Sequence, residues 1–196
     1  MLERVRYVFV WLSRIFHCRG FGVQSPTDYR FVRYVINEHW PYYKYGEIGQ
    51  GDSWQTRHVG RLCFRLANWL QPKIVTATAY QEYIQAGCGR CRLVDDSVEV
   101  DMAVVTSGKD VDRVLSKCRE RSLLVFDKLY QQPALWQRIV EEPVVTVTYD
   151  LYYCGIALFD PKRAKKHYKV NFNFNGQFLY YPNFKGEGKF SDLTFN

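Results

Sequence analysis

The most conspicuous chemical motif in the chain is a pair of cysteines with CxxC spacing, Cys88-Gly89-Arg90-Cys91. A structural zinc site needs four ligands, and the chain offers no second pair at a matching distance. A redox-active CxxC opens a helix after a strand, whereas this one precedes a predicted strand. We therefore interpret Cys88 and Cys91 as exposed, reduced thiols without a metal.

The sequence shows no other recognisable catalytic motif. The four histidines are scattered along the chain, and no Ser-His-Asp, Cys-His or paired-glutamate set can be assembled. The Walker and G-x-G-x-x-G phosphate-binding patterns are absent. Three tyrosines in a glycine-containing loop, Tyr42, Tyr43 and Tyr45, could line a pocket or a partner surface, or could pack beneath the loop.

Composition narrows the classes of function. The 196 residues suffice for one domain with an appendage, and 47% of them are hydrophobic. The net charge is +7, but Lys and Arg are spread out, which favours a solvated basic surface and makes nucleic-acid binding unlikely. Cys63, Cys118 and Cys154 lie in apolar segments, where cysteine behaves as a small hydrophobe. Reduced thiols and a cytoplasmic location are expected.

Helices are predicted before Pro72 and a sheet after it. A first helix covers Leu2–His17. Ser25 followed by Pro26 is a helix start signal, and Pro41 is expected to end that helix. A third helix ends at Pro72.

Strands and helices alternate after Pro72, which predicts a largely parallel sheet. The last two strands are separated by only Tyr149-Asp150, too short a link for a parallel crossover, so they should be antiparallel. In chain order, the predicted strands are Lys73–Ala79, Cys91–Asp95, Asp101–Thr106, Ser122–Asp127, Val144–Thr148 and Leu151–Phe159.

The two ends of the chain carry further expectations. Leu2–Phe16 mixes arginines with large apolar residues, and Lys162–Lys169 is basic; together they could make a weak contact with a membrane surface. The apolar residues surround the first predicted helix and form no single stripe, so packing on its own domain is favoured. Asn175-Gly176 predicts a hairpin in the tail.

Two segments resemble class I S-adenosylmethionine-dependent methyltransferase-like proteins of the Bacteroidetes type. The lead-in GFGVQSP at Gly20–Pro26 is similar to the HG-x-HSP lead-in of that family. The segment VVTVTYDLYYCGIALF at Val144–Phe159, with Lys166-His167-Tyr168 after it, is similar to the family's final strand pair. The resemblance implies an α/β fold with a Rossmann-like, methyltransferase-type open sheet. That sheet is mostly parallel with an antiparallel hairpin edge, and an N-terminal helical cap precedes it.

The chain departs from the family at the cofactor turn. In such folds the cofactor sits at the carboxyl ends of the first strands, where a glycine-rich turn lets the backbone approach it. Here residues 78–83 read TAYQEY, and no glycine occurs between Gly60 and Gly87. The spacing of the strands differs as well. Only about twenty residues separate the predicted strands Lys73–Ala79 and Asp101–Thr106, whereas the family has two βα units between the matching strands.

Thr106 stands where the family has an acidic residue at the end of a strand. Asp127 and Lys128 stand at the positions of its paired acids, and Tyr130 stands at the position of its following histidine. A lone carboxylate holds a divalent cation poorly. Asp95 and Asp96 could replace the ribose-binding acid or could simply form a solvated turn. The predicted vestigial crevice comprises Thr76, Thr78, Tyr80, Asp95, Asp96, Thr106, Asp127 and Tyr130.

These observations favour a degenerate, non-catalytic methyltransferase-like protein without a cofactor. It would be a binding or scaffold module for an unknown protein partner or a second copy. The expected parts are a helical cap at 1–71, a sheet core at 72–169 that lacks a full cofactor half, and a hairpin or tail at 170–196. The alternatives are an active S-adenosylmethionine-dependent methyltransferase with an atypical cofactor turn, and a peripheral membrane-associated protein.

Overall fold

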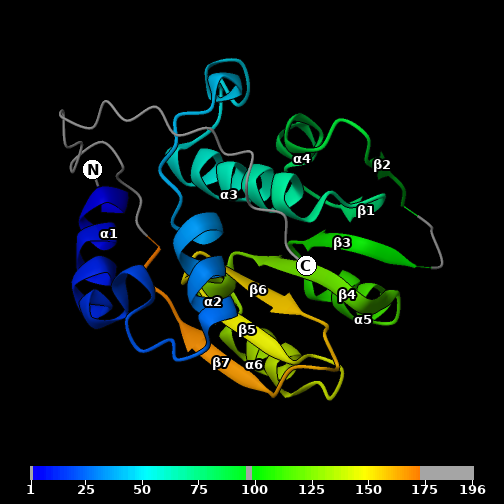
Figure 1. Cartoon of the computed structure of the whole chain (residues 1–196). Coiled ribbons are helices and arrows are strands. Elements are labelled where there is room, and N and C mark those ends of the chain that lie inside the picture. The colour runs from blue at the N-terminus through cyan, green and yellow to red at the C-terminus, as the bar shows by residue number, and fades with distance from the viewer. Residues whose placement is uncertain (1, 96–98, 173–196) are drawn as a thin grey trace.

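The computed structural model describes residues 2–95 and 99–172, which form an α/β fold of three layers (Figure 1). A seven-stranded sheet of the described residues is the middle layer, in the order β2-β1-β3-β4-β6-β5-β7. The strands are β1 (Ile74–Ala77), β2 (Arg92–Leu93), β3 (Val100–Val105), β4 (Cys118–Asp127), β5 (Val147–Asp150), β6 (Cys154–Leu158) and β7 (Lys166–Lys169).

Helices pack on both faces of this sheet (Figure 1). The α-helices are α1 (Leu2–Ser13), α2 (Pro26–Phe31), α3 (Trp54–Leu70), α4 (Gln81–Gly87), α5 (Gly108–Leu115) and α6 (Pro133–Glu141). The shorter helical turns are η1 (Ile15–Gly20), η2 (Val32–Ile36), η3 (Tyr43–Gly46) and η4 (Leu129–Gln131). Helices α2 and α3 cover one face, and α5 and α6 cover the other.

Strand directions confirm the Rossmann-like open sheet. Strand β1 runs parallel to β2 and β3, and β3 runs parallel to β4. Strand β6 is antiparallel to both of its neighbours, β4 and β5. The predicted antiparallel hairpin is therefore present as β5 and β6, and β7 pairs in parallel outside it.

The turn of this hairpin lies later than the sequence indicated. Tyr149 and Asp150 belong to β5, and the chain turns through Leu151–Tyr153. The side chain of Asp150 explains the shift, because its Oδ1 accepts a hydrogen bond of 2.8 Å from the backbone N–H of Tyr152. Such a local bond stabilises a tight turn.

The basic stretch after the hairpin forms a strand that the sequence pattern did not predict. The backbone N–H of Lys166 donates to the carbonyl of Thr146 at 2.8 Å, and that of Val170 donates to the carbonyl of Asp150 at 2.9 Å. The ring Nδ1 of His167 lies 2.8 Å from the hydroxyl of Thr148. Backbone pairing at the sheet edge therefore overrides the polar composition of β7.

Two helices end earlier than expected. Helix α1 ends at Ser13, and the chain continues as the 3-10 helix η1. Helix α2 is capped by Ser25 as predicted, but its continuation η2 ends at Ile36, before Pro41. The buried guanidinium of Arg65 donates to the carbonyls of Val35 (2.7 Å) and Ile36 (2.8 Å), which satisfies the helix end.

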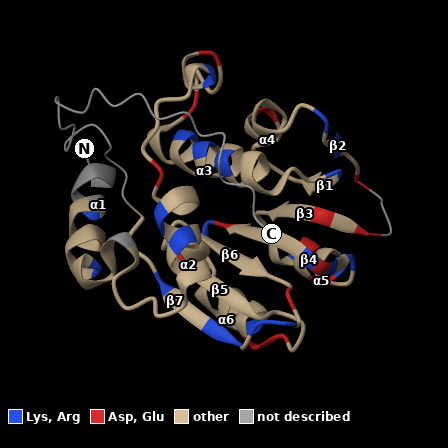
Figure 2. Ribbon diagram, viewed as in Figure 1, with Lys and Arg blue, Asp and Glu red and all other residues tan. Residues whose placement is uncertain are grey.

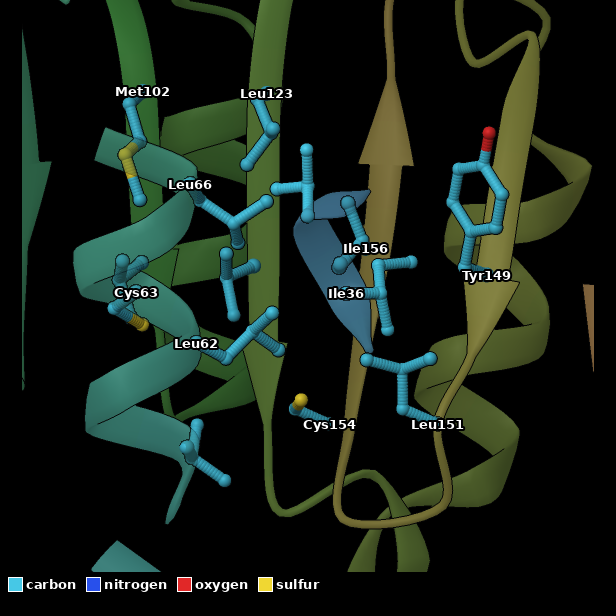
Figure 3. Close-up of a cluster of buried hydrophobic side chains, with 14 of the residues drawn as sticks. Ile36, Leu62, Cys63, Leu66, Met102, Leu123, Tyr149, Leu151, Cys154 and Ile156 are labelled. Atoms are coloured by element: carbon cyan, nitrogen blue, oxygen red, sulfur yellow. The ribbon is translucent and has the colours of Figure 1, made fainter. Parts of the chain in front are cut away.

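Alternate residues along the strands divide the core in two. Leu62 and Leu66 of α3 pack with Met102, Leu123 and Ile156 on one face of the sheet, and all five are fully buried (Figure 3). Helices α2, η2 and α3 thus share one hydrophobic cluster with the sheet. The opposite cluster joins α5 and α6 to the other face. The predicted tail hairpin at residues 175–176 lies outside the described residues.

Candidate functional site

The candidate crevice lies where β1, β3 and β4 end side by side. In open parallel sheets, ligands bind outside the carboxyl ends of the strands. Here the first polar residues at those ends bond to one another. The backbone N–H of Thr78 donates to the carbonyl of Val104 at 3.0 Å, and its hydroxyl lies 3.3 Å from that of Thr106. These contacts use polar groups that a bound ligand would need.

Tyr80 extends from the turn after β1 towards the end of β4. Its hydroxyl donates a 2.9 Å hydrogen bond to Oδ2 of Asp127, the last residue of β4. Strand β3 lies between β1 and β4 in the sheet, so the Tyr80 side chain bridges the width of the crevice. Its ring packs against the hydrophobic cluster beneath α3.

The backbone at Tyr80 has a conformation that glycine favours. Its φ is 63° and its ψ is 21°, in the left-handed region. A bulky side chain raises the energy of that conformation by about 1 kcal/mol. The turn therefore has a glycine-type backbone although the sequence contains no glycine there.

Asp127 is the other half of the bridge and is only 2% exposed. Burial raises the pKa of its carboxyl, and this outweighs the hydrogen bond from Tyr80, the backbone hydrogen bond from Lys128 and the charge of Lys128. Its second oxygen, Oδ1, is buried without a hydrogen-bond partner. Burial is therefore the dominant influence on this carboxyl.

Two buried thiols flank Asp127. Cys154 is paired with it across β4 and β6, and Cys63 lies on α3 (Figure 3). Burial raises the pKa of both thiols, so neither is a reactive thiolate. Among the described residues, no group of three or more His, Cys, Asp or Glu side chains could hold a metal ion.

Amide side chains close the remaining strand ends. Gln81 donates to the carbonyl of Ala77 at 2.8 Å, and Gln132 donates to the carbonyl of Thr106 at 3.2 Å. Both carbonyls stand at the positions from which a ligand would be approached. The chain's own side chains therefore satisfy the polar groups at this edge of the sheet.

Three of the other predicted crevice residues lie away from this bridge. The hydroxyl of Thr76 donates to the carbonyl of Val94 at 2.7 Å and so ties β1 to the segment after β2. Asp95 is exposed, and Asp96 lies outside the described residues. Tyr130 stacks on Tyr152, with ring centroids 5.5 Å apart. The structure thus brings together Thr78, Tyr80, Thr106 and Asp127.

The CxxC pair differs from the expectation of exposed thiols. Cys88 is buried with 3% exposure, and its thiol lies 3.6 Å from the carbonyl of Pro72. Cys91 is partly buried. The expectation was wrong for Cys88 because it follows α4 directly and packs into the α3 cluster. All six cysteines are free thiols.

Sequence reasoning missed a second polar centre around Asp28, which is 2% exposed. Its carboxylate accepts hydrogen bonds from the hydroxyls of Tyr149 and Tyr168, the latter at 3.1 Å, and pairs with the guanidinium of Arg163. Burial alone would raise the pKa of Asp28, but the hydrogen bonds and charge from these partners hold it below its usual value.

A cavity of about 510 Å³ adjoins this centre, lined in part by Gln24, Ser25, Asp28, Arg163 and Lys166. Its two acids, Asp28 and Asp160, balance its two cations, so it favours neither sign of ligand. The only early signal was Asp28 in the first turn after the Ser25 cap, a position where an acid stabilises a helix without further partners. Its partners are more than 100 residues away.

The fold defines the chain as an α/β protein with a Rossmann-like open sheet, and the Tyr80–Asp127 hydrogen bond spans its candidate crevice. No protein-family model matches the chain, and no curated protein sequence is significantly similar to it.

Proposed function

We propose that the chain is a methyltransferase-like protein without catalytic activity that acts as a binding or scaffold module. The observation that carries this proposal is the hydrogen bond between Tyr80 and Asp127 across the carboxyl ends of the strands. A cofactor at this edge requires a bare turn after the first strand. Here the turn bears a tyrosine, whose hydroxyl donates to Asp127 at the end of β4.

An active methyltransferase with an atypical turn would need an open crevice beside β1 and β3. The bridge, together with Gln81 and Gln132 at the strand ends, argues against this alternative. Asp95 is exposed, and no described contact directs it towards the bridge. The proposal therefore assigns no cofactor to the chain.

Isothermal titration of the full chain with S-adenosylmethionine and S-adenosylhomocysteine tests the proposal. No binding is expected for the natural chain, and micromolar binding of either compound would contradict it. Tyr80→Gly is the informative variant, because it removes the bridge and suits the left-handed backbone. Tyr80→Phe is its matched control, since it keeps the ring and removes only the hydrogen bond.

A binding role has support from exposed aromatic side chains on the helical layer before residue 72. Tyr34, Trp40 and Tyr43 are 62%, 64% and 78% exposed, and Trp69 at the end of α3 is 48% exposed. Tyrosine and tryptophan are enriched in protein interfaces. The proposed partner is another protein or a second copy of the chain, and analytical ultracentrifugation over a concentration series separates these two outcomes.

A further inference from the structure

A stripe of large apolar side chains runs along the outer side of α1 and η1 and into the following turn. Six side chains between 41% and 77% exposed form this apolar stripe: Val8, Phe9, Leu12, Ile15, Phe16 and Phe21. Val8, Phe9 and Leu12 lie at i, i+1 and i+4 of α1, which is the spacing of one helix face, and the other three follow in η1 and just after it. Two further apolar residues of α1, Val10 and Trp11, are partly buried, so apolar residues also occur outside this stripe.

The opposite side of α1 is fixed to the protein, so the stripe cannot turn inward without breaking those contacts. Arg14 donates to the carboxylate of Asp150 at 2.9 Å and to its carbonyl at 2.8 Å. Arg6 donates to the hydroxyl of Tyr152 at 2.9 Å, and its guanidinium lies 4.4 Å from the ring centroid of Tyr130. The polar anchors and the apolar stripe thus divide the helix into two faces.

A basic strand, β7, leads towards η1. The residues that follow β7 reach η1, where the backbone N–H of Asn171 donates to the carbonyl of His17 at 2.9 Å. Strand β7 and the turn before it carry four exposed lysines, Lys162, Lys165, Lys166 and Lys169, and basic residues mark this strand in Figure 2. No acidic residue occurs between positions 161 and 169.

Two carboxylates near this region are already paired with arginines. Asp150 is bound by Arg14, and Asp28 is bound by Arg163. The lysines of β7 are therefore not neutralised by these carboxylates, and the whole chain carries a net charge of +7. A stripe of exposed apolar side chains together with a strand of exposed lysines is complementary to a lipid surface, which has anionic headgroups over an apolar interior.

We propose that the apolar stripe and the lysines of β7 dock the protein on an anionic lipid surface. The phenylalanines enter the boundary between headgroups and acyl chains, and the lysines contact acidic headgroups. No described helix is long and apolar enough to cross a membrane, and the proposal requires only contact with the surface. It does not depend on the absence of catalysis.

Co-sedimentation of the full chain with lipid vesicles tests this proposal. Binding is expected to vesicles of phosphatidylcholine with about 30% phosphatidylserine, and at least about tenfold weaker binding to phosphatidylcholine alone. Raising NaCl to about 0.5 M should weaken binding by a similar factor, because salt screens the lysines.

Two double variants separate the apolar part from the charged part. Phe9→Ser with Phe16→Ser should weaken vesicle binding about tenfold or more, and Lys166→Glu with Lys169→Glu should do so only for anionic vesicles. The matched control is Tyr34→Ser with Trp40→Ser, which removes equally exposed aromatic rings elsewhere and should not change binding. Far-UV circular dichroism of each variant confirms that it is folded.

Four results would overturn the proposal. The natural chain could stay in the supernatant with anionic vesicles, or it could bind both vesicle types equally. The Phe9 and Phe16 variant could leave vesicle binding unchanged. If that variant instead converts a dimer to a monomer in lipid-free ultracentrifugation, the stripe is an interface between two copies and the lipid proposal is wrong.

Discussion

Asp28 and Asp127 are both 2% exposed, but their surroundings act on their charge in opposite directions. The pKa of Asp28 is lowered because hydrogen bonds from Tyr149 and Arg163 and the charge of Arg163 outweigh its burial. The pKa of Asp127 is raised because burial is the dominant influence. The two carboxyls should therefore give opposite contributions to the pH dependence of stability.

Asp28→Asn should lower the free energy of unfolding by about 3 kcal/mol near neutral pH, because it leaves Arg163 without its partner. A lowered folded-state pKa gives stability that is complete above the ordinary pKa of an aspartate and is lost as the pH falls. The cost of the substitution should therefore shrink in acid. Urea denaturation at several pH values measures this loss of unfolding free energy. A loss that grows in acid would contradict the lowered pKa of Asp28.

Asp127→Asn should have the reverse pH dependence. A raised folded-state pKa gives stability that is complete at low pH and is lost as the pH rises through that value. The amide cannot ionise and can still accept the hydrogen bond from Tyr80. In the same urea experiments, the variant should therefore gain stability relative to the natural chain as the pH rises above the ordinary pKa of an aspartate. A relative loss with rising pH would contradict a raised pKa for Asp127.

Gly87, at the end of α4, is expected to tolerate no side chain. A Cβ there would lie 2.3 Å from the backbone carbonyl oxygen of Phe64 in α3, and backbone cannot move aside as a flexible side chain can. Gly87→Ala should lower the free energy of unfolding by about 2 kcal/mol. Gly89→Ala, with no atom within 4 Å of its Cβ, should change it by less than about 0.5 kcal/mol. If both substitutions changed the free energy of unfolding equally, the close contact between α3 and α4 at Gly87 would be contradicted.

At the scale of elements, α1 is held mainly by long-range contacts. Arg14→Gln removes the ion pair with Asp150, and hydrogen exchange of the amides at residues 6–20 should become about tenfold faster, since a hydrogen bond to a charged group contributes about 1.5 kcal/mol. Exchange in β3 and β4 should not change. Arg113→Gln, which breaks an exposed pair with Asp110, is the control and should leave α1 unaffected.

Elements defined by local signals were predicted well from the sequence. The Ser25 cap and the apolar runs of β3, β4 and β6 depend on residues close together in the chain. Strand β7 was missed because its pairing partner, β5, lies about twenty residues away and its own composition is polar. The end of η2 was missed because Arg65, which satisfies it, comes from another helix.

The candidate site was predictable in part for the same reason. Strand ends locate Thr78, Thr106 and Asp127 at one edge once a parallel sheet is assumed. The direction of the Tyr80 side chain was not predictable, because it depends on a left-handed backbone at a non-glycine residue. The Asp28 centre was hidden because its partners come from β5, β7 and the turn between β6 and β7.

At the scale of the whole molecule, α2, η2 and α3 share one hydrophobic cluster with the sheet. We expect them to unfold in a single transition. Leu66→Ala in α3 should lower the free energy of unfolding by about 3 kcal/mol and should shift the far-UV circular dichroism and tryptophan fluorescence transitions together. Leu12→Ala, at a side chain 50% exposed, is the control. Separate transitions would show that the helical layer is an independent domain.

The two edge strands of the sheet, β2 and β7, affect how readily copies of this protein aggregate at high concentration. Strand β2 has two residues, and β7 carries exposed Lys166, His167 and Lys169. A short edge offers little backbone for pairing, and a lysine-rich edge repels the same edge of another copy. Among the described strands, neither outer edge suits strand-by-strand growth into fibrils. High-concentration storage should therefore yield soluble material whose aggregation rises when salt screens the lysines of β7.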